Sequence, residues 1–186
     1  MGPTPAFERL RTEVLWQGRR LSMARVVVRA PDGEEFEREF TQHPGAVGVI
    51  AVDDQGLVTL VRQFRAPLGT TVLEMPAGTC DHDGEDALTT AQRELSEEAG
   101  LEASAWRRLA RLPVSPGVTN QETTVFLATG LRPCPTAREG PEERAMTLEQ
   151  VPLDRVVELA AAGELIDAPT LAGVALAQLI VSGARP

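Results

Sequence analysis

The chain has little cysteine, no long apolar run and no excess of positive charge, and each shortage argues against a class of protein. Cys80 and Cys134 are its only cysteines, and their spacing does not match a metal site. No apolar signal segment indicates an oxidising compartment, so we expect free thiols in a cytoplasmic protein. The longest mostly apolar stretch, Leu171 to Val181, is shorter than the roughly 20 residues that span a bilayer. We therefore expect no membrane partner.

The balance of charge is acidic. The 186 residues carry a formal net charge of −9, with 27 acidic against 18 basic side chains. Affinity for nucleic acid depends largely on cations that neutralise phosphates, so the charge argues against a nucleic-acid partner. A phosphorylated small ligand would have to be held by local cations against the overall field. The length suits one well-buried domain.

One helix is clearly predicted, and it carries an unusual group of carboxylates. Apolar residues recur at three- and four-residue intervals between positions 87 and 99, and Gly100 stands where a left-handed C-terminal cap belongs. Glu94, Glu97 and Glu98 fall together on one flank beside that apolar stripe. Like charges at this spacing repel by roughly 0.2–0.5 kcal/mol per pair. The helix dipole disfavours each of them by about a further 0.3–1 kcal/mol.

Two interpretations of this acidic flank are open. Charge runs on helices are usually solvated faces without a function. A sequence selected only for helix stability, however, would place lysines in the last turn. Clustered carboxylates are explained if a hard divalent cation neutralises them, and Mg²⁺ typically takes one or two carboxylates, waters and a substrate phosphate.

The residues around the flank favour the metal. The run RELSEEAGL at 93–101, with Glu85 eight residues before Arg93 and Gly78 upstream, resembles the signature box of the Nudix hydrolases. The family pattern leaves five residues between the glycine and the first glutamate, whereas six lie between Gly78 and Glu85. The extra residue falls in a loop that contains Asp83, so the helix register should be intact. The resemblance implies that Arg93 is structural rather than catalytic and ties Glu85 or a nearby carboxylate to the helix.

The resemblance also implies a metal site. Glu94 and Glu98 are then the principal ligands of Mg²⁺ (or Mn²⁺), Glu97 assists with the metal or with a catalytic water, and the Ala77 carbonyl completes the coordination shell. Pyrophosphate hydrolysis needs a water placed in line with phosphorus and neutralisation of the non-bridging oxygens, which metals and positioning supply.

Turn signals divide the rest of the chain into strands and helices. The strands that we predict are 26–28 with 34–40 as an N-terminal hairpin, 49–52 with 57–64 around a DDQG turn, 72–75, 106–114, 123–131 and 146–151. The further helices that we predict are 153–162 and one that begins after Asp167 and Pro169. Residues 115–122 and 132–144 are expected to be loops.

This order of elements predicts an α/β (α+β) layered domain. The resemblance adds the Nudix fold, a mixed β-sheet sandwiched between α-helices, with an N-terminal antiparallel hairpin. We expect residues 1–42 to form the N-terminal β-hairpin region and residues 43–186 to form the Nudix hydrolase domain.

Segments outside the box resemble the ADP-ribose pyrophosphatase branch of the family. They are HPGAV at 43–47, RQFR at 62–65, EMPAG at 74–78, SPG at 115–117 and GELIDAPTLAG at 163–173. The branch implies hydrolysis of ADP-ribose to AMP and ribose 5-phosphate. Where the branch usually carries an aspartate and then a glutamate, this chain has Asn120 and Gln121. Another nucleoside-diphosphate sugar or a dinucleotide therefore stays open as the substrate, as does a non-catalytic ADP-ribose-sensing module.

The same resemblance implies where the substrate binds. The positions that match are Arg65, Glu74, Ser115, Gly117 and Arg25. Arg25 belongs to the predicted hairpin, and related enzymes commonly take an arginine from the neighbouring chain. We expect a homodimer in which the N-terminal hairpin crosses to the other subunit. The alternative is a hairpin packed on its own domain.

A last candidate group lies in the loop at 132–144. Related enzymes place a glutamate from the loop before the last strand over the metals, and Glu143, with Glu142 as the close alternative, holds that position. We predict that one of them is the catalytic base or orients the attacking water. The alternative is a solvated acidic loop.

Overall fold

The computed structural model describes residues 6–82 and 84–181, and these form two compact units. The N-terminal unit contains the described residues up to Pro44 together with 113–122, and the main unit contains the rest of the described chain. The predicted boundary between residues 42 and 43 stays a prediction. Asp83, in the predicted loop between Gly78 and Glu85, lies outside the described residues. So do residues 1–5 of the predicted hairpin region and residues 182–186 of the predicted hydrolase domain.

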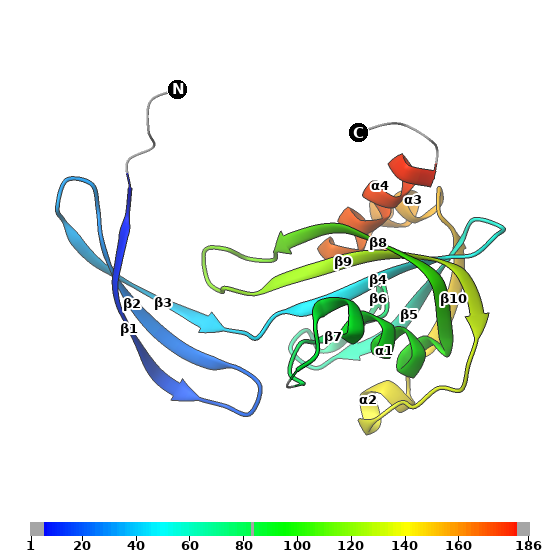
Figure 1. Ribbon diagram of the computed structural model, residues 1–186, viewed down its shortest axis with the longest axis horizontal. Coiled ribbons are helices and arrows are strands. Elements are labelled where there is room, and N and C mark those ends of the chain that lie inside the picture. Colours follow the sequence, from blue (N-terminus) through cyan, green and yellow to red (C-terminus); the bar gives the residue numbers. More distant parts are fainter. Residues whose placement is uncertain (1–5, 83, 182–186) are drawn as a thin grey trace. The chain divides into compact units, whose positions relative to one another are not determined.

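The N-terminal unit is built on an antiparallel sheet in the order β1-β2-β3 (Figure 1). Its strands are β1 (Glu8–Gln17), β2 (Ser22–Arg29) and β3 (Glu35–Gln42). The predicted hairpin is the β2–β3 pair, in which Val26 is opposite Arg38 and Val28 is opposite Phe36. β1 pairs with the other side of β2, so the predicted hairpin is part of a larger antiparallel sheet. Almost every residue of β1 is exposed, so its sequence lacks the apolar alternation that marks a half-buried strand.

The main unit is organised around a mixed sheet in the order β10-β5-β4-β9-β8. Its strands are β4 (Ala46–Val52), β5 (Leu57–Arg65), β6 (Thr70–Glu74), β7 (Ala77–Thr79), β8 (Leu101–Pro113), β9 (Glu122–Pro133) and β10 (Thr147–Pro152). β4 runs parallel to β9 and antiparallel to β5 and β7. β6 and β7 pair with β5 and β4 respectively, off the main path.

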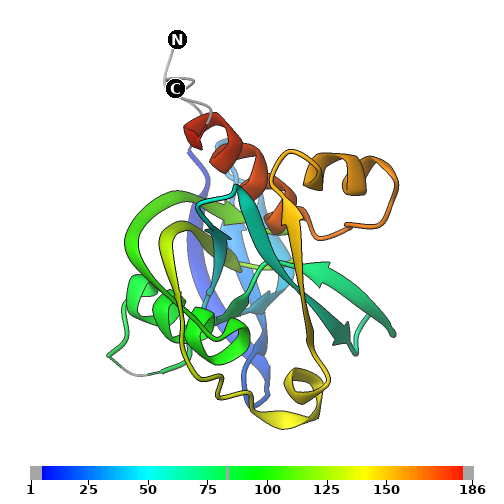
Figure 2. The ribbon, with the colours of Figure 1, turned by 90° about the vertical axis from the view of Figure 1, so that its right-hand side faces the viewer.

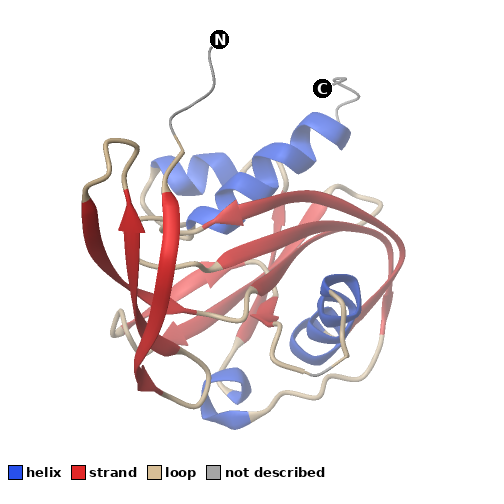
Figure 3. Cartoon of the chain, turned by 60° about the vertical axis from the view of Figure 1, so that its left-hand side comes forward, coloured by secondary structure: helices blue, strands red, loops and turns tan. Residues whose placement is uncertain are grey.

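Helices cover both faces of this sheet, which confirms the predicted layered fold (Figures 1 and 3). They are α1 (Ala87–Ala99), α2 (Gly140–Arg144), α3 (Val156–Ala161) and α4 (Ala168–Val181). One apolar core joins α1 to one face of β4 and β9. A second core joins α3 and α4 to the other face of the sheet. No helix in the described part of the chain is long and apolar enough to cross a membrane.

Close contacts fix α4, which is red in Figure 2, against its face of the sheet. Asp167 caps the helix by accepting a hydrogen bond from the Thr170 N–H at 2.9 Å. The Thr170 hydroxyl accepts a hydrogen bond from the Met75 N–H at 2.9 Å. A β-carbon at Gly173 would lie about 3 Å from side-chain atoms of Ile50 and Val125, so glycine lets the helix approach the sheet closely.

Two predicted boundaries need correction, and one strand was missed. β8 begins at Leu101 rather than at Trp106, and it follows the α1 cap directly. The short strand β7 was missed, because three residues including a glycine give no periodic signal. The predicted loop at 132–144 ends in the short helix α2, whose start is marked by a proline in its first turn.

Candidate active site

Both ends of α1 are fixed by local interactions, of which only the Gly100 cap was predicted. The N-cap residue Asp86 is extended, and its side chain accepts a hydrogen bond from the Thr89 N–H at 2.8 Å. Gly100 adopts a left-handed conformation with φ 65° and donates to the carbonyls of Leu95 and Ser96. These caps fix the helix register, and with it the direction of every side chain on the helix.

The apolar stripe of α1 turns two glutamates inward. Ala91 and Leu95 are fully buried in the core beneath the helix. Glu94 and Glu98 lie beside this stripe, and Glu98 is only 3% exposed. Glu97, on the outer flank, is half-buried. The predicted acidic flank is therefore mostly buried and is not a solvated face.

The backbone of β7 lies directly against these carboxylates. The Ala77 N–H donates to the Glu98 carboxylate at 2.9 Å. A β-carbon at Gly78 would overlap the carboxylate of Glu94. Glycine at this position thus leaves the space that the Glu94 carboxylate fills, and the additional loop residue between Gly78 and Glu85 does not prevent that contact.

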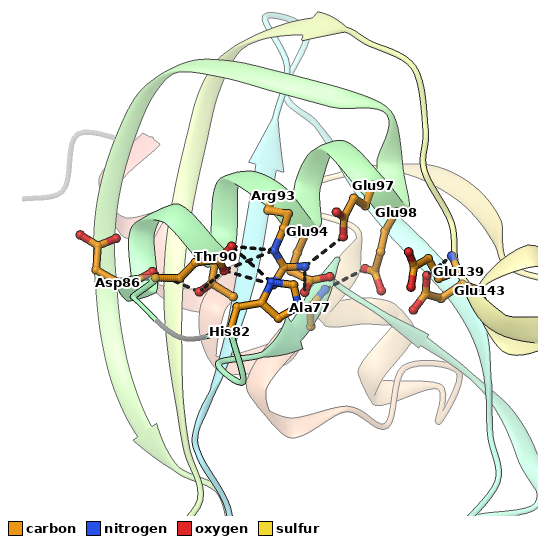
Figure 4. A network of polar contacts seen from close by, with 11 residues as sticks. Ala77, His82, Asp86, Thr90, Arg93, Glu94, Glu97, Glu98, Glu139 and Glu143 are labelled. Atoms are coloured by element: carbon orange, nitrogen blue, oxygen red, sulfur yellow. Dashed lines mark hydrogen bonds and ion pairs between the residues drawn. The ribbon is translucent and has the colours of Figure 1, made fainter. Parts of the chain in front are cut away.

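Arg93 joins three carboxylates, as Figure 4 shows. Its guanidinium contacts Glu85 at 3.2 Å, Glu94 at 2.8 Å and Glu97 at 3.0 Å. The predicted tie between Arg93 and Glu85 is therefore present. Thr90 strengthens it, because its hydroxyl donates to Glu85 at 3.1 Å. Sequence reasoning missed Thr90, although it lies five residues after Glu85 and one turn before Arg93.

Burial changes the acidity of the inward-facing glutamates. Removal from water raises the pKa of Glu98 to about 8; the Ala77 N–H opposes the rise, and the charges of Glu94 and Glu143 add to it. The pKa of Glu94 is also raised, chiefly by burial and further by Glu97 and Glu143, against the effect of Arg93. Buried carboxylates of this kind favour either a proton or a cation.

The chemistry of these groups fits a hard divalent ion. Within residues 6–82 and 84–181, no set of three ligand side chains already converges as a metal site. Glu94 and Glu97 are bound to Arg93 instead. The donors on this flank are all oxygens, which Mg²⁺ and Mn²⁺ prefer. A cation beside Glu94 and Glu98 would offset the cost of burying both charges.

The structure distinguishes the two glutamates predicted in the loop at 132–144. Glu143 lies beside Glu98 in Figure 4 and raises the pKa of both Glu94 and Glu98. Its carboxylate is fixed by the Glu139 N–H, which donates to it at 2.7 Å. Glu142, in the same helix, is exposed. The geometry therefore favours Glu143.

Two of the predicted substrate residues form an ion pair in the main unit. Arg65 on β5 contacts the buried carboxylate of Glu74 on β6 at 2.8 Å. The pKa of Arg65 is raised chiefly by the hydrogen bond to Glu74 and partly by the charge of Glu98. Arg62 instead pairs with Glu149 on β10.

The other three predicted substrate residues lie in the N-terminal unit. Arg25 on β2 is paired with Glu37 at 3.4 Å and with Glu39 at 2.9 Å. The Ser115 carbonyl accepts a hydrogen bond from the Val118 N–H at 3.0 Å, which closes the turn that contains Gly117.

Gln63 is a polar residue of the RQFR segment to which sequence reasoning gave no role. It lies two residues before Arg65 on β5, so the two side chains share a face of the strand. Gln63 is buried, and its amide oxygen has no hydrogen-bond partner among the described residues. Buried polar atoms nearly always have a partner, so the amide is a candidate for contact with a ligand or water. The signal available in the sequence was a glutamine within a predicted strand that is mostly apolar.

A pocket of about 420 Å³ lies on another flank of α1. Its lining residues are Thr89, Gln92, Arg93, Ser96, Glu102, Ala103, Trp106 and Arg132. The lining includes Arg93 but none of the three box glutamates, so the pocket does not contain the carboxylate cluster.

Comparison with known proteins places the chain in a family. A model of the NUDIX domain matches residues 42–172. The ADP-ribose pyrophosphatase of Mycobacterium tuberculosis (strain ATCC 25618 / H37Rv) is 37% identical over 177 residues, covering 95% of this chain and 86% of that protein. The ADP-ribose pyrophosphatase of Bacillus subtilis (strain 168) is 35% identical over 167 residues, covering 90% of each.

A solved structure described as an ADP compounds hydrolase shares the fold, with a TM-score of 0.81 and 21% sequence identity over 98% of both chains. The family model covers the strands and helices that hold the glutamate cluster. The resemblance seen in the signature box is thus confirmed, and this chain belongs to the NUDIX family.

Proposed function

We propose that this protein is a divalent-metal-dependent hydrolase that cleaves ADP-ribose to AMP and ribose 5-phosphate. The observation that carries the proposal is the placement of Glu94 and Glu98, which are turned inward on α1 against the backbone of β7. The relatives named as ADP-ribose pyrophosphatases support the choice of substrate, since they match nearly the whole chain.

In this proposal Glu94, Glu97 and Glu98, with the Ala77 carbonyl, hold Mg²⁺ or Mn²⁺. The ion supplies neutralisation of the phosphate oxygens and lowers the pKa of bound water. Arg93 orients the carboxylates through its contacts with Glu94 and Glu97.

Glu143 takes the proton of the attacking water, a role that typically contributes about 10²–10⁴ in rate. The buried Glu74 carboxylate fixes the Arg65 guanidinium through an ion pair. The fixed guanidinium then orients the substrate through a bidentate contact. Ser115, Gly117 and Arg25 are further substrate-binding residues in this proposal, by resemblance to the ADP-ribose pyrophosphatases.

We also propose that the protein is a homodimer in which the N-terminal unit contributes to the partner's site. Val26 and Val27 of β2 are buried, so they offer no exposed apolar surface to a partner. Exposed apolar residues are present on β1, where Val14 is 53% and Trp16 is 58% exposed. β1 is also an edge strand, and exposed apolar edges tend to pair with another chain.

Other substrates remain as alternatives within the family. Asn120, which departs from the branch pattern, has a structural role, because its side-chain oxygen accepts a hydrogen bond from the His43 N–H at 2.8 Å. Because the chain departs from the branch pattern at this position, another nucleoside-diphosphate sugar or a dinucleotide is the second candidate. The two free cysteines support the proposed cytoplasmic location, since free thiols are usual in reducing compartments.

A substrate panel tests the proposal directly. Purified protein is incubated with Mg²⁺ or Mn²⁺ and ADP-ribose, other nucleoside-diphosphate sugars or dinucleotides, and the products are separated by chromatography. We expect AMP and ribose 5-phosphate to form fastest from ADP-ribose, and no product after chelation of the metal. Binding of ADP-ribose without product at saturating metal would indicate a sensing module instead.

A further inference from the structure

The segment that follows β9 is fastened to the C-terminal end of α1. The Ala137 N–H donates to the Glu97 carbonyl at 3.2 Å, and Arg138 Nε donates to the Glu98 carbonyl at 2.9 Å. The last carbonyls of a helix have no partner within the helix. These two bonds therefore supply partners to two of the last carbonyls of the helix that carries the glutamate cluster.

The same guanidinium also reaches the start of β10. Arg138 Nη1 donates to the Met146 carbonyl at 2.7 Å, and Met146 is buried immediately before the strand. The residues between these two contacts, 139–145, include α2 (Figure 2, yellow). We call residues 139–146 the α2 segment. One side chain thus joins both ends of the α2 segment to α1.

Glu143 is held within the α2 segment by the backbone of that segment. Its carboxylate accepts from the Glu139 N–H at 2.7 Å, and its carbonyl accepts from the Met146 N–H at 3.1 Å. A movement of either end of the segment therefore moves the Glu143 carboxylate relative to α1. Misplacement of a catalytic group by about 1 Å costs up to roughly 10²-fold in rate.

We propose that Arg138 is a positioning residue that fixes the α2 segment, and with it Glu143, over the glutamates of α1. The inference rests on the proposed hydrolase function for its effect on rate, but not for its effect on the segment. Arginine suits the position because its planar group carries donors in several directions and reaches two carbonyls at once. Its positive charge also complements the negative end of the helix dipole.

The first experiment measures the segment without any substrate. Amide hydrogen exchange is compared in the wild type, Arg138→Met and the control Arg144→Met, which removes an exposed arginine of the same segment. We expect the Ala137 and Met146 amides to exchange about tenfold faster or more in Arg138→Met, and within twofold of wild type in the control. Unchanged exchange in Arg138→Met would overturn the proposal that Arg138 fixes the α2 segment. Protection of the α1 amides reports whether each variant is folded.

The second experiment measures whether Arg138 acts through Glu143. We expect Arg138→Met to lower kcat about 10- to 100-fold with KM within threefold of wild type, and Arg138→Lys, which keeps a donor for one carbonyl, to lose less. In a Glu143→Gln background, Arg138→Met should cost less than threefold, because two residues that act as one unit are not additive. An equal loss in both backgrounds would overturn the positioning role. If the wild type showed no hydrolysis, the proposed function would be refuted instead. Hydrogen exchange would still test whether Arg138 fixes the α2 segment.

Discussion

Arginine joins several carboxylates in both units of this protein, but at different depths. In the main unit, the side chain of Arg93 is 21% exposed and binds Glu85, Glu94 and Glu97. In the N-terminal unit, the side chain of Arg29 is 44% exposed and binds Glu8 and Glu35. The distances are similar, yet exposed pairs typically contribute little, whereas breaking a buried pair leaves charges without water or partners. Burial, more than contact geometry, separates the Arg93 network from the Arg29 network.

The largest expected effect follows from the most buried charge. Glu98→Gln keeps size and hydrogen bonding but removes a ligand charge, so we expect turnover at limiting Mg²⁺ to fall by at least about 10³-fold. Near-normal turnover of Glu98→Gln under these conditions would show that Glu98 is not a metal ligand. Assays of both proteins over a range of Mg²⁺ concentrations provide the measurement.

The same substitution predicts a change in pH dependence without metal. Because burial raises the pKa of Glu98 to about 8 from an ordinary 4.5, the folded metal-free protein keeps a proton that the unfolded chain releases above about pH 4.5. Stability therefore falls as pH rises from about 4.5 to about 8. Glu98→Gln should remove this decline and match or exceed wild-type stability near pH 8. Thermal unfolding in chelator at several pH values checks this, and identical pH profiles would contradict it.

The next effect distinguishes two neighbouring glutamates at different depths. Glu143 approaches the cluster and Glu142 is exposed, so we expect Glu143→Gln to lower kcat by about 10²-fold. Glu142→Gln is the matched control and should stay within twofold of wild type. The reverse result, with Glu142→Gln impaired and Glu143→Gln active, would move the role by one residue.

A smaller effect is expected on stability when the half-buried Arg93 is removed. Arg93→Met leaves the carboxylates of Glu85, Glu94 and Glu97 without their shared cation. Hydrogen bonds to charged groups are worth about 1.5–3 kcal/mol, and we expect a loss of roughly 2–3 kcal/mol in metal-free urea unfolding. Saturating Mg²⁺ should restore part of this loss if the ion binds the same carboxylates. A loss under about 0.5 kcal/mol would show that burial does not strengthen this network.

The parts of the site that the sequence predicted depend on local spacing. The period of α1, its Gly100 cap and the positions of Glu94 and Glu98 follow from residues three or four apart. The tie between Arg93 and Glu85 also lies within this one stretch. These features confirmed the expected geometry, because a capped helix fixes the direction of its own side chains.

The features that sequence reasoning missed depend on distant segments or on weak patterns. Arg138 reaches the Glu98 carbonyl from forty positions along the chain, and no local pattern indicates that contact. β1 shows no alternation, because almost all of it is exposed. β7 is too short for a period, and its importance becomes visible only through the contact of Gly78 with Glu94. Tertiary packing therefore determines these features, and sequence periodicity does not predict them.

The smallest expected effect tests the exposed side of the comparison. Arg29 binds Glu8 at 2.9 Å and Glu35 at 2.8 Å, so it joins β1 and β3 across β2. All of these side chains are in contact with water, and exposed pairs typically contribute about 0.2–1 kcal/mol. We expect Arg29→Met to lower the unfolding free energy by much less than Arg93→Met does, and by still less in 1 M salt, where such pairs are screened. Urea unfolding at low and high salt is the measurement. A loss as large as that of Arg93→Met, independent of salt, would mean that Arg29 is buried in the functional assembly, and would thereby support an interface between two copies of the N-terminal sheet.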